Sequence, residues 1–369
     1  MRRLALVTTI ATLLVAPAAS SGATVPFGFF GVSIDGVMFR STINQAAEFQ
    51  LMARSGVESV ISEVNWNFLQ PHEDQPPDWA RIDSVVRNAA GRGMRVMANV
   101  IYAPPWASVD PKNGASPPEP DKFAGFLRAA VQRYGTDGTF WSEHPTLPKL
   151  PVLDWQVWNE PPSKYYWSKQ PFQKKYVELL KAARFAVKLT DQHARIILAG
   201  LTFKSWEDLG KIYAAGGKGL FDAVSLHPYT GTPAQVKYIV NLNRNVMIKN
   251  GDGRLPVLIT EMGWPSAKGK TRDNGGHGFG YEVTPAEQAQ KLREALPMLA
   301  AARVRLHIQR VYYHNWASTD TGHHTFDYAG LRRLHGNRLI NKPALAAYRD
   351  GALALEGCKH KGTTAKRCG

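Results

Sequence analysis

The sequence has little cysteine and no long apolar run beyond its first residues. Among 369 residues only Cys358 and Cys368 are cysteines, and both stand in the terminal stretch CKHKGTTAKRC. A zinc site of four thiolates is excluded by this count. A mixed thiolate–histidine finger is disfavoured because the two cysteines are not closely spaced and no paired histidines follow them. No later segment reaches the ~20 apolar residues of a transmembrane helix, so we expect no membrane insertion.

Signatures of nucleotide and nucleic-acid binding are also missing. The first predicted strand runs directly into SIDG, residues 33–36, without a glycine-rich phosphate loop. No helix-turn-helix or RNA-binding motif is present, and the positive charges are scattered rather than striped. The net charge of +15 therefore indicates a basic surface in water, with an anionic cell wall or acidic polysaccharide as the alternative partner. We expect no nucleic-acid partner and no cofactor.

The first residues have the pattern of a secretory signal peptide. A basic start, residues 1–3, precedes an apolar stretch over residues 4–15 and then the small residues APAASSGA. The apolar stretch is well short of a membrane span, which disfavours an anchor. We predict a signal peptide over residues 1–23, cleavage within residues 18–24, and a secreted protein.

Apolar, β-rich runs recur eight times and alternate with helical patterns. The runs are Phe27–Ile34, Val57–Val64, Arg95–Ile101, Leu153–Trp158, Ile196–Ala199, Ala223–Leu226, Pro256–Thr260 and His307–His314. The helical patterns are Asn44–Arg54, Trp79–Arg92, Lys122–Tyr134, Pro171–Leu189, Ser205–Ala215, Pro233–Asn250, Pro285–Ala302 and Pro343–Leu355. Alternation predicts a parallel sheet. Eight units without a linker predict one α/β domain, a (β/α)8 TIM barrel with enlarged loops, over residues 24–356. A doubly wound open sheet is the alternative.

The remaining residues, 357–369, form a basic C-terminal tail. In an oxidising compartment we expect Cys358 and Cys368 to form a disulfide that closes a small loop, and two reduced thiols in an unstructured tail are the alternative. The segment Lys359–Lys361 is expected to be a solvated end.

The residues that end the predicted strands carry the chemistry, because active sites of such barrels lie at the carboxyl ends of the strands. The fourth run ends in Asn159 and Glu160, the sixth in His227-Pro228-Tyr229, and the seventh in TEMGW with Glu261. Two carboxyl groups across one mouth are what acetal hydrolysis requires. One protonates the departing oxygen, and the other attacks the anomeric carbon or activates water.

Aromatic residues also gather at or just beyond the strand ends, where flat apolar faces can stack on sugar rings. They are Tyr102, Trp106, Trp158, Tyr229, Trp264 and Trp316. Asp35 and Asn99 either line the same site or only cap loops, and Trp66 and Trp106 can equally be core residues. The adjacent pair His323-His324 is expected on a solvated loop, because neighbouring histidines rarely ligate one ion, and we predict no metal site.

The motifs WQVWNEP, HPY and TEMGW, followed by a tryptophan after the eighth run, occur in that order. This set resembles the retaining (β/α)8 glycoside hydrolases of clan A, and most nearly its family 39-like and family 5-like secreted enzymes. The resemblance covers residues 27 to about 355. It implies that Glu160 is the general acid/base, that Glu261 is the nucleophile, and that Asn159 hydrogen-bonds the sugar 2-hydroxyl.

The resemblance also implies that Tyr229 steadies the nucleophile, that His227 lines the site, and that Trp316 forms the platform under the sugar. Trp264, Trp106 and Tyr102 complete the expected substrate-binding set. One departure concerns the second run. Similar enzymes often carry an arginine near the nucleophile in a segment like VRFDFPWSxIEP, whereas this chain has VISEVNWNFLQP with Ile61 at that place. Glu63, Asn65 or an arginine from elsewhere are the candidates to replace it.

Together these features predict a secreted, retaining β-glycosidase that acts, as a monomer, on a polysaccharide or oligosaccharide. The alternative is a barrel of the cell wall or exterior that binds carbohydrate without cleaving it. The two carboxyl groups with Asn159 favour the enzyme. Glucan, mannan, xylan, galactan, arabinan and microbial exopolysaccharides all remain candidate substrates, with internal or terminal cleavage.

Overall fold

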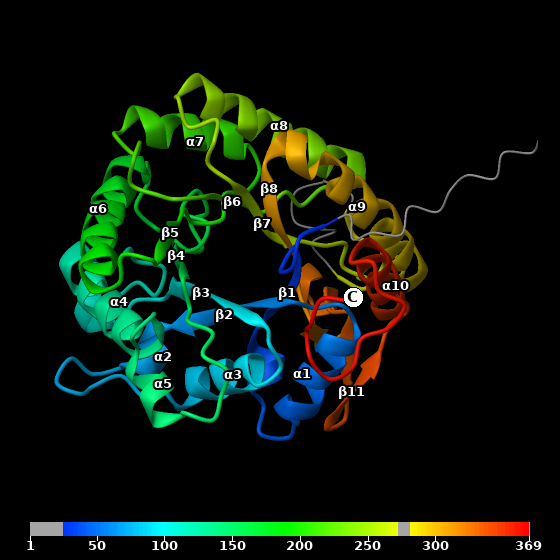
Figure 1. The fold of residues 1–369 in the computed structure, drawn as a ribbon. Coiled ribbons are helices and arrows are strands. Elements are labelled where there is room, and N and C mark those ends of the chain that lie inside the picture. The colour runs from blue at the N-terminus through cyan, green and yellow to red at the C-terminus, as the bar shows by residue number, and fades with distance from the viewer. Residues whose placement is uncertain (1–24, 272–280, 369) are drawn as a thin grey trace, which may run out of the picture.

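Eight parallel strands close into a barrel in the computed structural model, which describes residues 25–271 and 281–368. The hydrogen-bonded order is β5-β4-β3-β2-β1-β8-β7-β6. Isolated bridges from Ile197 to Ala223 and from Leu201 to Leu226 join the two outer strands of that order. The helices form a ring outside the strands (Figure 1). The prediction of a (β/α)8 barrel is confirmed, and the alternative prediction of an open, doubly wound sheet is wrong.

The strands are β1 (Phe30–Ile34), β2 (Ser59–Asn65), β3 (Arg95–Ile101), β4 (Asp154–Val157), β5 (Arg195–Ile197), β6 (Val224–Leu226), β7 (Val257–Met262) and β8 (Ile308–Tyr313). The helices are α1 (Gln45–Arg54), α2 (Trp66–Leu69), α3 (Ala80–Ala90), α4 (Pro120–Tyr134), α5 (Thr139–Glu143), α6 (Gln173–Thr190), α7 (Ser205–Ala214), α8 (Pro233–Lys249), α9 (Pro285–Leu306) and α10 (Pro343–Leu355). Among the described residues, no helix is both long enough and apolar enough to span a membrane.

Each predicted run overlaps one barrel strand, and the boundaries are fixed by local signals. Thr232 and Thr284 form capping boxes with the third residues of α8 and α9, and a proline stands at the first position of each helix. The short elements escape prediction. They are α2, α5, the 3-10 turns, and a small sheet of β9 (Ala317–Ser318), β10 (Arg332–His335) and β11 (Arg338–Asn341), which are too short to show a period.

The inside of the barrel is layered, because successive side chains of a strand point to opposite faces. One layer is apolar and contains Ile61, Met97, Leu258 and Tyr312, among others. Toward the amino ends of the strands, the buried carboxylate of Asp154 accepts hydrogen bonds from Arg195 and Arg310. Toward the carboxyl ends lies a layer of amide and hydroxyl side chains, which supports the mouth of the barrel.

The C-terminal tail covers the end of the barrel opposite the mouth. The disulfide between Cys358 and Cys368 is present. Lys361, within its loop, is buried and ion-paired with Glu58 at 2.5 Å and with Glu356 at 2.6 Å. Lys359 and His360 are exposed, as expected of a solvated end, whereas the expectation is wrong for Lys361, because two buried carboxyl groups hold its ammonium group.

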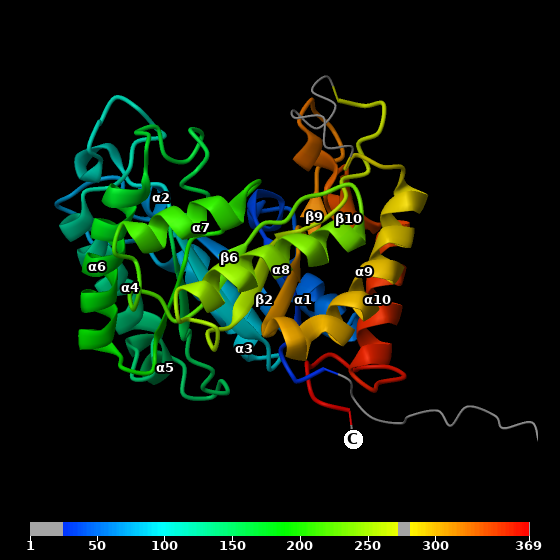
Figure 2. The same cartoon turned by 90° about the horizontal axis from the view of Figure 1, so that it is seen from above.

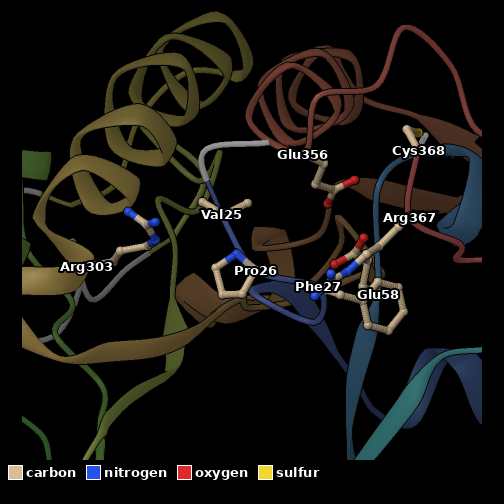
Figure 3. A pocket seen from close by; sticks show the side chains of 8 residues that line it. All are labelled: Val25, Pro26, Phe27, Glu58, Arg303, Glu356, Arg367 and Cys368. Carbon is tan, nitrogen blue, oxygen red and sulfur yellow. The ribbon is translucent and has the colours of Figure 1, made fainter. Parts of the chain in front are cut away.

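A hollow of about 500 Å³ lies beside this tail and is lined by Val25, Glu58, Arg303 and Arg367, among others (Figure 3). These residues adjoin the amino ends of the strands, so the hollow is remote from the strand ends that carry Glu160. The predicted signal peptide, residues 1–23, lies outside the described residues.

Loops rise on two sides of the barrel mouth (Figure 2). On one side are the segments after β3 and β4, and on the other are those after β7 and β8. Within the first group, the amide of Ser168 donates to the carbonyl of Ala115 at 2.8 Å. The loops after β3 and β4 are therefore tied to each other. Residues 272–280, which follow β7, lie outside the described residues.

Candidate active site

A buried layer of polar side chains forms the floor of the mouth. Gln156 of β4 donates to the Oδ1 atoms of Asn99 at 3.0 Å and Asn159 at 3.4 Å, and the hydroxyl of Ser225 donates to its Oε1 atom at 3.0 Å. Asn99 also donates to Asn159 at 3.3 Å. Asn99 thus belongs to the same network as Asn159, and both side chains are buried. This network fixes the end of β4 because buried polar groups are costly unless they are paired.

Glu160 follows directly after this layer. Its Oε1 atom lies 2.6 Å from Nδ1 of His227, and its side chain is only 16% exposed. Burial raises the pKa of Glu160 to about 7, against a small opposing contribution from His314. A carboxyl group with this pKa is still largely protonated under mildly acidic conditions, which is the state a general acid needs.

Glu261, in β7, faces Glu160 with more hydrogen-bond donors around it. The hydroxyl of Tyr229 donates to its Oε2 atom at 2.7 Å, and His227 Nδ1 lies 3.5 Å from the same atom. Burial and then the charge of Glu160 raise the pKa of Glu261, while His227 and Tyr229 lower it. Because these donors favour the charged form, we assign the ionised state to Glu261 and the proton to Glu160.

His227 lies beneath both carboxyl groups and is itself buried. Burial lowers its pKa, and its Nε2 atom has no hydrogen-bond partner among the described residues. A proton on Nε2 would therefore be buried without an acceptor, so we assign the neutral tautomer with the proton on Nδ1. Gly200 leaves room for the ring, since a Cβ atom there would overlap the imidazole.

His314 ends the eighth predicted run, and the sequence analysis gave it no role in the site. Its Nδ1 atom lies 2.8 Å from the hydroxyl of Ser33 in β1 and 3.9 Å from Oε2 of Glu261. Its ring also meets Tyr229 and Phe326 edge-on, at 6.4 Å and 5.7 Å between centroids. Residues 310, 312 and 314 alternate onto the inner face of the barrel, so the period of two identifies His314.

Two further carboxyl groups reach the mouth. The side chain of Asn315 donates to Asp35 at 2.7 Å, and Asn65 donates to Glu63 at 3.2 Å. Burial is the largest cause that raises the pKa of each acid, and the charge of Glu261 adds to it in both cases. Asp35 and Glu63 therefore lie within electrostatic reach of Glu261, and both belong to the site.

The place of the expected arginine is filled differently in this chain. Ile61 lies in the apolar layer of the barrel. The Oε2 atom of Glu261 lies 2.7 Å from the hydroxyl of Tyr229, 3.5 Å from Nδ1 of His227 and 3.9 Å from Nδ1 of His314. A phenol and two imidazoles therefore surround the carboxylate where the similar enzymes have a guanidinium group.

Three strand-end residues have left-handed backbones although none is glycine. The φ angles are +58° at Tyr102, +74° at Trp158 and +41° at Glu160. Such conformations cost roughly 1–3 kcal/mol each and concentrate at functional sites, where the surrounding structure imposes them. These backbone angles therefore identify the ends of β3 and β4 as a functional site without reference to the chemistry of the side chains.

Two of the predicted aromatic contacts are corrected by burial. Trp316 has no exposed surface and donates its indole N–H to Glu48 at 2.9 Å. Trp264 is 1% exposed and donates to the carbonyl of Thr230 at 2.8 Å. Both indoles pack in the core, so neither offers a face to a sugar, and the platform expected at Trp316 is wrong.

Trp158 is also buried and donates its indole N–H to the carbonyl of Tyr166 at 2.9 Å, whereas Tyr102, Trp106 and Tyr229 are partly exposed. Tyr229 is half-buried and meets Phe326 at 4.9 Å between ring centroids. Trp106 packs edge-on against Trp66, which is fully buried, and donates to the carbonyl of Gln70 at 3.2 Å. Phe326, 39% exposed, is a second site residue that the sequence analysis missed, because it lies in a 3-10 helix, Thr325–Tyr328, that is too short to show a period.

The described residues contain one group that could hold a metal ion. The ligand atoms of Glu160, His227 and Glu261 all lie within 4.8 Å of one another. Since Nδ1 of His227 is already engaged with Glu160, hydrogen bonding explains the cluster. His323 and His324 are exposed, as the solvated-loop interpretation predicts.

The comparisons with known proteins agree with this geometry. A family model described as cellulase (glycosyl hydrolase family 5) matches residues 20–318. No curated protein matches the chain in sequence.

Similar solved structures include a family 39 glycoside hydrolase from Bacteroides cellulosilyticus WH2, at 18% identity and a TM-score of 0.65, which aligns over 89% of this chain and 64% of that one. A monomeric β-xylosidase from Caulobacter crescentus CB15 has 17% identity and a TM-score of 0.63, over 88% and 67% of the two chains. The endoglucanase Cel5A of Pseudomonas stutzeri has 15% identity and a TM-score of 0.58, over 95% and 100%. The chain thus spans about two thirds of the first two structures, and at these identities the likeness shows the fold.

Proposed function

The chain belongs to glycosyl hydrolase family 5, the cellulase family, and from this we propose that it is a secreted, retaining β-glycosidase in which Glu160 is the acid/base and Glu261 the nucleophile. Family membership makes it a glycoside hydrolase with a carbohydrate substrate, and disfavours the barrel that only binds sugar. The observation that carries the proposed mechanism is the separation of the two glutamates.

One carboxylate oxygen of Glu160 lies within 4.8 Å of one of Glu261. Retaining glycosidases hold their two carboxyl groups about 5–5.5 Å apart, whereas inverting enzymes need about 6.5–9.5 Å to admit a water molecule between sugar and base. The observed gap is too narrow for that water. It supports direct attack by a carboxylate on the anomeric carbon.

The asymmetry between the two glutamates supports their roles. In the first step Glu261 attacks the anomeric carbon, the bond to the leaving oxygen breaks, and the proton of Glu160 passes to that oxygen. In the second step Glu160, now ionised, takes a proton from water, whose oxygen attacks the same carbon and releases Glu261. Tyr229 and His227 hold the attacking carboxylate in place, and Asn159 would contact the sugar 2-hydroxyl.

Export is proposed from the leader pattern of residues 1–23 and agrees with the disulfide of the C-terminal tail. Expression of the full chain with its leader, followed by N-terminal sequencing of protein from the medium, tests it. A first residue between 19 and 24 is expected, and a chain retained in the cell with Met1 intact would contradict export.

Chemical rescue with azide tests the two roles separately. With an aryl β-glycoside, the Glu261→Gly variant plus azide should give the α-glycosyl azide by one inverting displacement. The Glu160→Ala variant should give the β-azide, because azide then intercepts the glycosyl-enzyme intermediate. Glu178→Gln, an exposed glutamate of α6 paired with Lys175, is the control and should behave as wild type.

Each single variant should lose at least about a hundredfold in turnover of an unactivated substrate. A product of inverted configuration from the wild-type enzyme, followed by NMR, would exclude the retaining mechanism. Unchanged turnover in either variant would remove that glutamate from its assigned role.

A further inference from the structure

We propose that the end of the barrel opposite the mouth docks on an anionic lipid bilayer, so that the enzyme rests on a membrane surface with its mouth turned away. Each barrel helix runs antiparallel to the strands, so the last turns of the helices lie where the strands begin. The C-terminal tail lies at this end, away from the loops that rise around the mouth (Figure 2). This basal face consists of the last turns of α6, α8 and α9, the loop after α7 (residues 215–223) and the tail (residues 357–368).

Large apolar side chains are exposed at this end of three helices. Leu189 of α6 is 70% exposed, Ile248 of α8 is 59% exposed, and Val304 of α9 is 70% exposed. Phe185, one turn before Leu189, is 73% exposed, and both line a shallow hollow of about 570 Å³ together with Leu220 of the basal face. Single apolar residues on a surface are normal. Here they recur at the same end of three helices, which is typical of a surface that a partner covers.

Cations accompany the apolar residues. The last turns of α6, α8 and α9 contain Lys188, Lys249, Arg303 and Arg305. The helix dipole favours a cation at a helix C-terminus, which explains these charges but not the exposed apolar side chains beside them. Lys188 and Arg184 share one carboxylate, that of Asp222, at 3.3 Å and 3.1 Å. Even this paired site therefore keeps a surplus of positive charge.

Contacts between neighbouring segments make the basal face continuous. A Cβ atom at Gly251, in the loop after α8, would meet the amine of Lys218, two residues before Leu220. The side chain of Arg305 in α9 donates to Asn241 of α8 at 3.2 Å. The apolar and cationic residues of the three helices therefore belong to one surface.

The acids beside the tail do not offset the cations at its surface. Glu58 and Glu356 line the hollow beside the tail together with Arg303 and Arg367 (Figure 3). Both glutamates are buried, and both pair with Lys361. Arg303 is half-buried and Arg367 is exposed. The charges that reach the surface beside the tail are therefore positive.

An anionic bilayer matches both features of this face. Lysine and arginine are attracted by anionic headgroups, and each strengthens binding roughly fivefold. Exposed leucine, isoleucine and phenylalanine side chains can enter the boundary between headgroups and acyl chains without any segment that spans the membrane. A second copy of this chain would bring like charges together, which is unfavourable. A soluble anionic polymer would satisfy the cations but leave the apolar side chains in water.

Sedimentation with sucrose-loaded vesicles tests the docking face. The purified chain is mixed with vesicles of phosphatidylcholine alone or with about one third phosphatidylglycerol, and every variant has the same first residue. Binding should require phosphatidylglycerol and should weaken as the salt concentration rises. The double variant Leu189→Ser with Ile248→Ser should bind on the order of tenfold more weakly. The double variant Lys249→Gln with Lys366→Gln should bind about twentyfold more weakly, roughly fivefold for each cation.

The controls lie in the same helices at the end near the mouth. Tyr238→Ser replaces an apolar ring in the second turn of α8 that is 61% exposed, and Lys174→Gln replaces an exposed cation in the first turn of α6. Both variants should bind vesicles as the wild type does, and all variants should keep wild-type glycosidase activity.

Three results would overturn the proposal. The first is equal binding to the two kinds of vesicle, or basal variants that bind like their controls. The second is wild-type binding of the Leu189→Ser with Ile248→Ser variant to the vesicles and to soluble polyphosphate, which would identify an anionic polymer as the partner. The third is a dimer in light scattering that this variant abolishes, which would identify a second copy of the chain.

Discussion

The pH dependence of hydrolysis should be set on its alkaline side by Glu160. Its pKa is raised to about 7 by burial, and a general acid acts only when protonated. Activity should therefore be retained up to neutral pH and lost above it. With a single pKa of 7, kcat/KM should be down about tenfold at pH 8 and about a hundredfold at pH 9 relative to the plateau.

The acidic side of the profile should belong to Glu261, which must be ionised to attack. Its pKa is raised above the ordinary value of 4.5, so activity should fall as the pH drops through that raised value. Because Glu160 and Glu261 interact across less than 4.8 Å, the two apparent constants describe the pair.

The decisive measurement combines the Glu160→Gln variant with a 2,4-dinitrophenyl β-glycoside, whose leaving group needs no protonation. Its kcat/KM reports the first step, and the alkaline limb near pH 7 should disappear in the variant. Wild type and Glu178→Gln, assayed with an unactivated glycoside, should keep it. If the limb persists near pH 7 in the variant, another group such as His314 or Glu63 controls it, and the assignment of the proton to Glu160 is refuted.

Three further predictions concern packing. Gly200→Ala should displace the ring of His227 and lower kcat/KM on the order of a hundredfold. The circular dichroism spectrum of the variant should be unchanged. A kcat/KM equal to that of the wild type would show that the site tolerates the displaced ring. Cys368→Ser removes the disulfide to Cys358, whose sequence separation is 10, and should lower the free energy of unfolding by about 2–3 kcal/mol. Urea titrations measure this change. An unchanged unfolding midpoint would mean that the disulfide does not contribute to stability. Lys361→Met should cost about 3–5 kcal/mol, because it leaves buried carboxylates without their cation. Burial raises the pKa of Glu356 to about 8 in the folded state, from 4.5. The stability that its proton gives is therefore lost as the pH rises from 4.5 through 8, and the melting temperature of the variant should fall further between pH 5 and 8.5 than between pH 4 and 5.

The architecture could be read from the sequence because it depends on local periodicity. Eight apolar runs and eight helical patterns are sufficient for a barrel, and the strand-end rule places Glu160 and Glu261 at one mouth without any coordinates. The tail could not be read in this way. Lys361 pairs with Glu58, which is 303 residues away in the sequence, and the tail has no sequence pattern that predicts a buried partner.

The error at Trp316 has a physical lesson. The resemblance to clan A enzymes predicted that Trp316 lines the site. The alternation of side chains along β8 instead predicts His314, which follows Arg310 and Tyr312 on the inner face. β8 ends at Tyr313, so its period of two does not extend to Trp316, whose indole N–H donates to Glu48 in the core.

The left-handed backbone at Glu160 has a consequence for protein engineering. A residue with φ of +41° and a buried carboxyl group is one at which folding would prefer glycine or asparagine, since these tolerate the conformation more easily. Replacing Glu160 by either should make the chain more resistant to heat and leave it inert. Libraries of this enzyme that are selected by thermal challenge alone will therefore enrich dead proteins, and any such selection has to be coupled to a screen for turnover.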